Sequence, residues 1–201
     1  TAQTSGSGSH GLYAGEPTTA GSRPTTTATR TSIKTTGDAA MGAVADRGGQ
    51  MNVSTSELIV SGQDAAGFVV RNADSEGHLT DSTVRAEGAG GAGLLVQDAG
   101  RMTGSGADVQ ASGIGGAALL VSSVARDQPA SRVTLSASSL SATAGTAVHV
   151  LGGSSVIALD GVNVSGSESA IRFADHADSP LVRGSISASG SHILGDVLDV
   201  S

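Results

Sequence analysis

Four acidic residues near the end of the sequence are the best candidates for chemistry: Asp160, Glu168, Asp175 and Asp178. Carboxylates held about 5 Å apart on neighbouring strands could cleave or eliminate across a glycosidic bond, or bind calcium. Enzymes that act on sugars usually add aromatic platforms, and this segment offers only Phe173, which the alternation of its strand directs inward. We therefore interpret the four acids as solvated turn residues.

A glycine-rich segment, residues 88–93, fits the nucleotide-binding pattern G-x-G-x-x-G, and Asp108 lies 20 residues after Gly88. That pattern binds pyrophosphate only when a helix begins directly after it. Here the apolar run Leu94-Leu95-Val96 follows, which is typical of a strand. The segment is therefore predicted to be a turn.

Other catalytic and metal-binding patterns are missing from the sequence. The five histidines are His10, His78, His149, His176 and His192. They show neither the H-E-x-x-H spacing of a zinc site nor a spacing that recurs between pairs. No serine stands in G-x-S-x-G, and the chain has no cysteine. We expect no catalytic residue, no metal site and no cofactor, and hence not an enzyme.

Composition narrows the class of protein further. The 201 residues carry a net charge of −7, from 11 basic and 18 acidic side chains, with no basic run that would favour nucleic acid. Only 1% of the residues are aromatic, although 38% are hydrophobic. Small aliphatic side chains must therefore fill a thin interior. No apolar run approaches the roughly 18 residues of a membrane helix.

A repeated apolar step organises the whole chain. Its copies begin 23 to 31 residues apart, at residues 11–14, 42–45, 67–70, 93–96, 118–121, 147–150, 170–173 and 197–200. Self-similarity at such a period indicates a stacked-repeat architecture. A solenoid offers long faces and loops, and these favour binding over chemistry.

Each repeat contains three short strand-like runs, which together predict one coil of a parallel β-helix. The third run alternates and places one residue of each repeat inside: Ile33, Val84, Val109, Leu140, Val164 and Ile186. Lys34, Arg85 and Gln110 then face solvent. Most third runs end in glycine, which we interpret as a corner with positive φ. The expected fold is all-β, with about eight coils.

We expect one domain over residues 1–201, in which residues 1–31 form an irregular N-terminal cap and a first coil with a Thr/Pro-rich loop. Two longer intervals, at residues 15–31 and 122–131, predict loops. The loops are either tolerated insertions or, together with the outward rows of the strands, candidate contact surfaces. The candidate binding residues in them are Pro17, Arg23, Pro24, Arg126, Asp127 and Gln128.

The chain resembles the passenger domains of pertactin-like autotransporters of Gram-negative bacteria. The resemblance lies in residues 10–13, residues 31–37 and 67–72, and the stretch from 130–135 through 148–153 to 159–161. It implies a right-handed parallel β-helix displayed at the bacterial cell surface after export across the outer membrane. It also implies that this chain is a truncated passenger whose only membrane contact would be through an absent C-terminal barrel.

The leading functional prediction is a non-catalytic adhesin, a virulence factor that binds host cells or extracellular matrix. Two alternatives stay open. One is a structural spacer or self-association module. The other is a polysaccharide-processing β-helix, which would require acids and basic groups clustered on one outward face.

Overall fold

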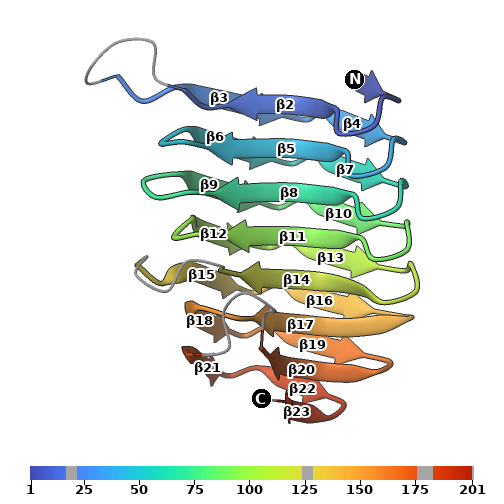
Figure 1. Cartoon of the computed structure of the whole chain (residues 1–201), viewed down its shortest axis with the longest axis vertical. Coiled ribbons are helices and arrows are strands. Elements are labelled where there is room, and N and C mark those ends of the chain that lie inside the picture. Colours follow the sequence, from blue (N-terminus) through green and yellow to red (C-terminus); the bar gives the residue numbers. More distant parts are fainter. Residues whose placement is uncertain (17–21, 124–128, 176–182, 201) are drawn as a thin grey trace.

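The chain winds into a right-handed parallel β-helix. The structure is a computed structural model that describes residues 1–16, 22–123, 129–175 and 183–200. In Figure 1 the front strands run from right to left, the back strands return from left to right, and the chain descends, which makes the coil right-handed. Among the described residues there is no helix long and apolar enough to cross a membrane.

Three sheets form the walls of the helix, and every neighbouring pair of strands is parallel. Sheet A contains β1 (Ala2–Thr4), β4 (Ser32–Thr35), β7 (Glu57–Val60), β10 (Thr83–Ala86), β13 (Asp108–Ala111), β16 (Ser139–Ala142), β19 (Asn163–Gly166) and β22 (His192–Leu194). Sheet B contains β2 (His10–Ala14), β5 (Met41–Asp46), β8 (Ala66–Arg71), β11 (Ala92–Gln97), β14 (Gly116–Ser122), β17 (Gly145–Leu151), β20 (Ser169–Ala174) and β23 (Val197–Val200). Sheet C contains β3 (Thr25–Thr29), β6 (Gln50–Ser54), β9 (Glu76–Thr80), β12 (Arg101–Ser105), β15 (Ser131–Ser136), β18 (Ser154–Asp160) and β21 (Arg183–Ser189).

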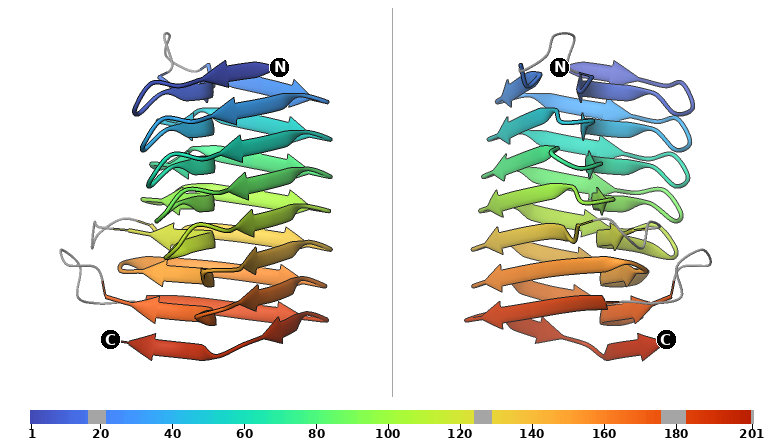
Figure 2. Two further views of the ribbon diagram at one scale, coloured as in Figure 1. Left: turned by 90° about the vertical axis from the view of Figure 1, so that its right-hand side faces the viewer. Right: turned by 60° about the vertical axis from the view of Figure 1, so that its left-hand side comes forward.

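The coil count is slightly lower than the predicted eight, because sheet C has seven described strands where sheets A and B have eight each. Figure 2 shows these coils stacked in one column, with the N-terminus on the first coil and the C-terminus on the last. The Thr-rich part of the expected first loop is strand β3. Ile186, predicted to continue the inward row of the third runs, lies in a different sheet, because its strand β21 pairs with β18 in sheet C. Ile193 of β22 is the register partner of Val164 instead.

The core is a set of inward rows, one side chain per coil. Ile33, Leu58 and Val84 show the pattern: they are register partners in sheet A and fully buried. The two phenylalanine rings of the core each pack against a glycine on another strand. A Cβ on Gly77 would lie 2.8 Å from the ring of Phe68, and one on Gly184 would lie 2.6 Å from the ring of Phe173. Phe173 packs against the core, as its alternation predicts.

The glycines at the corner between sheets A and B have a different role from the predicted one. A Cβ on Gly62 or Gly88 would lie within 1.9 Å of the backbone oxygen of the glycine one coil earlier. Close approach of backbones therefore requires glycine here. Positive φ occurs two residues later in the turn, at Asp64 (53°) and Gly90 (67°).

Buried serines tie the coils together at the corner between sheets C and A. The hydroxyl of Ser82 donates to the carbonyl of Thr80 at 2.7 Å and accepts from the backbone N–H of Ser56 at 3.1 Å. Ser138 does the same with Ser136 and Ala107. Each hydroxyl thus satisfies a backbone donor that would otherwise be buried without a partner.

Candidate functional site

The structure does not bring the predicted acidic residues together. Asp160 ends β18 at the corner between sheets C and A, Glu168 lies between β19 and β20, and Asp175 follows β20 at the third corner. Asp178 lies outside the described residues. In the described part of the chain, no three acidic or histidine side chains are grouped so that they could hold a metal ion.

The glycine-rich segment is a turn, as predicted. Residues 87–91 connect β10 to β11, and residues 92–93 of the segment already belong to β11, which occupies the place where a nucleotide-binding fold would have a helix. The histidines are also dispersed, because His10 lies on sheet B, His78 on sheet C and His192 on sheet A. His176 lies outside the described residues.

His149 lies on the outer side of sheet B, beside its register partner Arg172. Its position matches the outward alternation of the sequence, but it is half-buried. Burial lowers the pKa of His149, and the nearby Arg172 guanidinium lowers it further, while Glu168 acts in the opposite direction. The lowered pKa favours the neutral imidazole in the folded chain.

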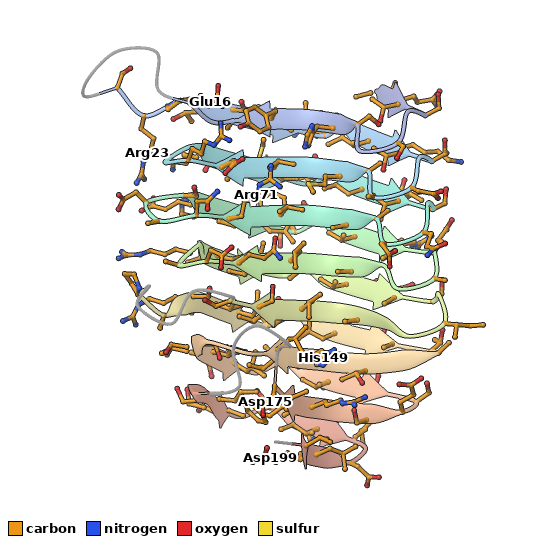
Figure 3. All side chains as sticks on the ribbon, in the orientation of Figure 1. Glu16, Arg23, Arg71, His149, Asp175 and Asp199 are labelled. Atoms are coloured by element: carbon orange, nitrogen blue, oxygen red, sulfur yellow. The ribbon has the colours of Figure 1, made fainter. Side chains whose placement is uncertain are left out.

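Two of the predicted loop residues are described, and both are engaged within the fold. The Arg23 guanidinium reaches Glu76 at 2.5 Å and the carbonyl of Asp74 at 2.8 Å, from the first coil to the third. The carbonyl of Pro24 accepts the backbone N–H of Gln50 at 2.8 Å. Figure 3 shows Arg23 at the edge of the upper coils, far from His149 and Asp175. Pro17, Arg126, Asp127 and Gln128 lie outside the described residues.

The outer face of sheet B is largely apolar. One register row crosses all eight strands through Tyr13, Val44, Val69, Leu95, Leu120, His149, Arg172 and Leu198. Val44 and Val69 are fully buried and form a second cluster with Ala66 and Ala92, separate from the interior of the coil. This face is therefore part of the packing of the fold.

A buried carboxylate closes the edge of that apolar face. Asp46 is 2% exposed and accepts from Arg71 at 3.0 Å, from Asn72 at 2.6 Å and from the Tyr13 hydroxyl at 3.3 Å. Burial raises the pKa of Tyr13, and the Asp46 charge raises it further. The four side chains come from the first three coils and join them.

The outer face of sheet C is polar and open. Sequence reasoning named outward rows as candidate contact surfaces but did not distinguish those of sheet C from those of the other two sheets. Its side chains form three parallel rows. The first row is Thr25, Gln50, Glu76, Arg101, Arg132, Val156 and Ser185; the second is Thr27, Asn52, His78, Thr103, Thr134, Ala158 and Ser187; the third is Thr29, Ser54, Thr80, Ser105, Ser136, Asp160 and Ser189. The alternation of polar outward residues with buried ones in β9, β12 and β15 is the sequence signal that could have identified this face.

Hydroxyl groups dominate the centre of this face. A shallow hollow of about 240 Å³ is lined by His78, Leu79, Thr80, Thr103, Gly104, Ser105, Thr134 and Ser136. The His78 Nδ1 lies 2.7 Å from the Thr103 hydroxyl, which fixes the imidazole over the sheet. The face therefore presents ordered donors and acceptors along successive coils.

Sheet A offers a narrower polar surface. Its central strands have four residues, so that each contributes two outward side chains where β9, β12 and β15 contribute three. A hollow of about 420 Å³ lies at its first coil, lined by Gln3, Thr4, Ser5, Lys34 and Thr36. Lys34 is the one charged side chain in this lining. Sheet C therefore has the wider outer face, with more outward side chains on each strand.

Comparison with known proteins gives no relative: no family model, curated protein or solved structure matches the chain.

Proposed function

We propose that this protein is an elongated, non-catalytic adhesion module that binds host cells or extracellular matrix through the outer face of sheet C. In this proposal the chain is displayed at a bacterial cell surface, as the resemblance to autotransporter passengers implies. The three polar rows of sheet C are the observation that carries the proposal. They place hydroxyl, imidazole and guanidinium groups at fixed spacing along one side of a rigid column.

The fold supports this role through regular spacing. Neighbouring strands lie about 4.8 Å apart, so from β3 to β15 each row repeats its polar groups at that interval. A ligand that extends along the column meets several similar contacts, and repeated weak contacts add up to useful affinity. Because the strands are hydrogen-bonded on both sides, binding requires little ordering of the surface.

Binding of the purified, labelled chain to epithelial cells and to matrix-coated plates tests the proposal. The informative variant is Thr103→Tyr with Thr134→Tyr, which covers the centre of sheet C with two rings that strands tolerate well. The matched control is Gln110→Tyr with Ser141→Tyr, on the outer face of sheet A.

We expect saturable binding by the parent chain and by the sheet A variant, and strongly reduced binding by the sheet C variant. All three proteins should keep the same far-ultraviolet circular dichroism. Equal binding by the two variants would contradict the assignment of the contact face. A folded parent chain that binds neither surface would contradict the adhesion role and favour a spacer.

A further inference from the structure

Two arginines stand side by side on the outer face of sheet C. Arg101 and Arg132 are register partners on β12 and β15, and both side chains are exposed. Register partners in adjacent parallel strands have Cα atoms about 4.8 Å apart. Like charges placed directly opposite one another destabilise a sheet. A negative group between the two guanidiniums would remove that cost.

The nearest acid in the same row is already occupied. Glu76 is the register partner of Arg101 on the other side, but its carboxylate pairs with Arg23. Within the described part of the chain, neither Arg101 nor Arg132 has an ion-pair partner. The Arg23–Glu76 pair therefore leaves two adjacent guanidiniums available to an external anion.

The groups next to the arginines suit sugar hydroxyls. Two residues along each strand, on the same face, lie Thr103 and Thr134, with His78 held against Thr103. Ser105 and Ser136 follow in the third row and line the same hollow. Hydroxyls both donate and accept, whereas guanidinium binds carboxylate or sulfate oxygens in a forked geometry.

We propose that Arg101 and Arg132 form a cationic, anion-binding subsite on the outer face of sheet C that binds a carboxylated or sulfated polysaccharide. The hydroxyl rows beside the arginines hold the neutral parts of its sugar units. This inference rests on the proposed adhesion function and names its ligand class. Because the chain has a net charge of −7, its overall field does not attract a polyanion, so binding depends on this local pair.

The test measures binding of the full chain to fluorescent oligosaccharides by anisotropy. Heparin fragments supply sulfate, polygalacturonate supplies carboxylate alone, and dextran is the neutral control. Arg101→Ala with Arg132→Ala is the test variant, and Arg85→Ala, an exposed arginine on sheet A, is the matched control. Duplex DNA of equal charge is a further polyanion of another class.

We expect the parent chain to bind at least one anionic probe and not dextran, with affinity falling from about 50 mM to about 300 mM salt. The double variant should lose about tenfold in affinity, while Arg85→Ala changes little. The probe that binds identifies the anionic group. No binding to either anionic glycan, an equal loss in both variants, or equal binding of DNA would overturn the inference.

The same variants separate this inference from the adhesion function. If Arg101→Ala with Arg132→Ala still binds cells while Thr103→Tyr with Thr134→Tyr does not, the contact face stands and the anionic ligand is wrong. If the parent chain binds oligosaccharide but no cell or matrix, the subsite stands and the adhesion role is wrong.

Discussion

The outer faces of sheets B and C belong to the same coils but are built in opposite ways. Val44 and Val69 on sheet B are fully buried, although they point away from the interior. Thr103 and Thr134 on sheet C are exposed. An outward position in a β-helix is thus not automatically a surface position. The face that remains open, and not the outward pattern itself, identifies the candidate contact surface.

The largest expected effect concerns the buried carboxylate at the edge of sheet B. Asp46→Ala should lower the free energy of unfolding by about 2–4 kcal/mol, because the Arg71 guanidinium loses its anion and Asn72 and Tyr13 lose their acceptor. Urea unfolding measures the change. Asp160→Ala, at the exposed end of β18, should stay within about 0.5 kcal/mol. Equal effects of the two substitutions would contradict the structural role of sheet B.

Opposite changes of polarity on the two faces test whether the outer face of sheet B is buried and that of sheet C is open. Val69→Thr keeps the side-chain volume but buries a hydroxyl that has no hydrogen-bond partner. It should lower the free energy of unfolding by about 1–3 kcal/mol. Thr134→Val makes the reverse change on sheet C and should alter stability by less than about 0.5 kcal/mol. Thermal and urea unfolding of both variants test this. A stable Val69→Thr protein would show that the outer face of sheet B is accessible to water.

The smallest expected effect is the pH dependence from His149. Its pKa is lowered below the ordinary 6.5, so the unfolded chain binds the proton more readily than the folded chain. The contribution of His149 to stability is therefore present above pH 6.5 and is lost as the pH falls below that value. His149→Gln should flatten the unfolding free energy over this range. A smaller slope should remain, since the pKa of His10 is also lowered by burial.

The stacked coils and most inward rows were predictable from the sequence, because period-two alternation repeats with each coil. Which of the outward faces stays open to solvent was not predictable. Local alternation distinguishes inside from outside but does not show that Val69 is covered and Thr103 is open, since that depends on neighbouring coils. Likewise, the run that contains Ile186 alternates equally well in either sheet. Arg23 stays a predicted contact residue, but its ion pair with Glu76, 53 positions away in the sequence, was not predictable from a local pattern.

The most direct test of the account is the protection of single cysteines during binding, because the chain has no cysteine of its own. Thr103→Cys and Gln110→Cys place one thiol on the outer face of sheet C and one on that of sheet A. The rate of maleimide labelling is measured with and without bound epithelial cells. We expect bound cells to slow labelling at position 103 and to leave labelling at position 110 unchanged. Unchanged labelling at position 103, or protection at position 110 alone, would contradict it.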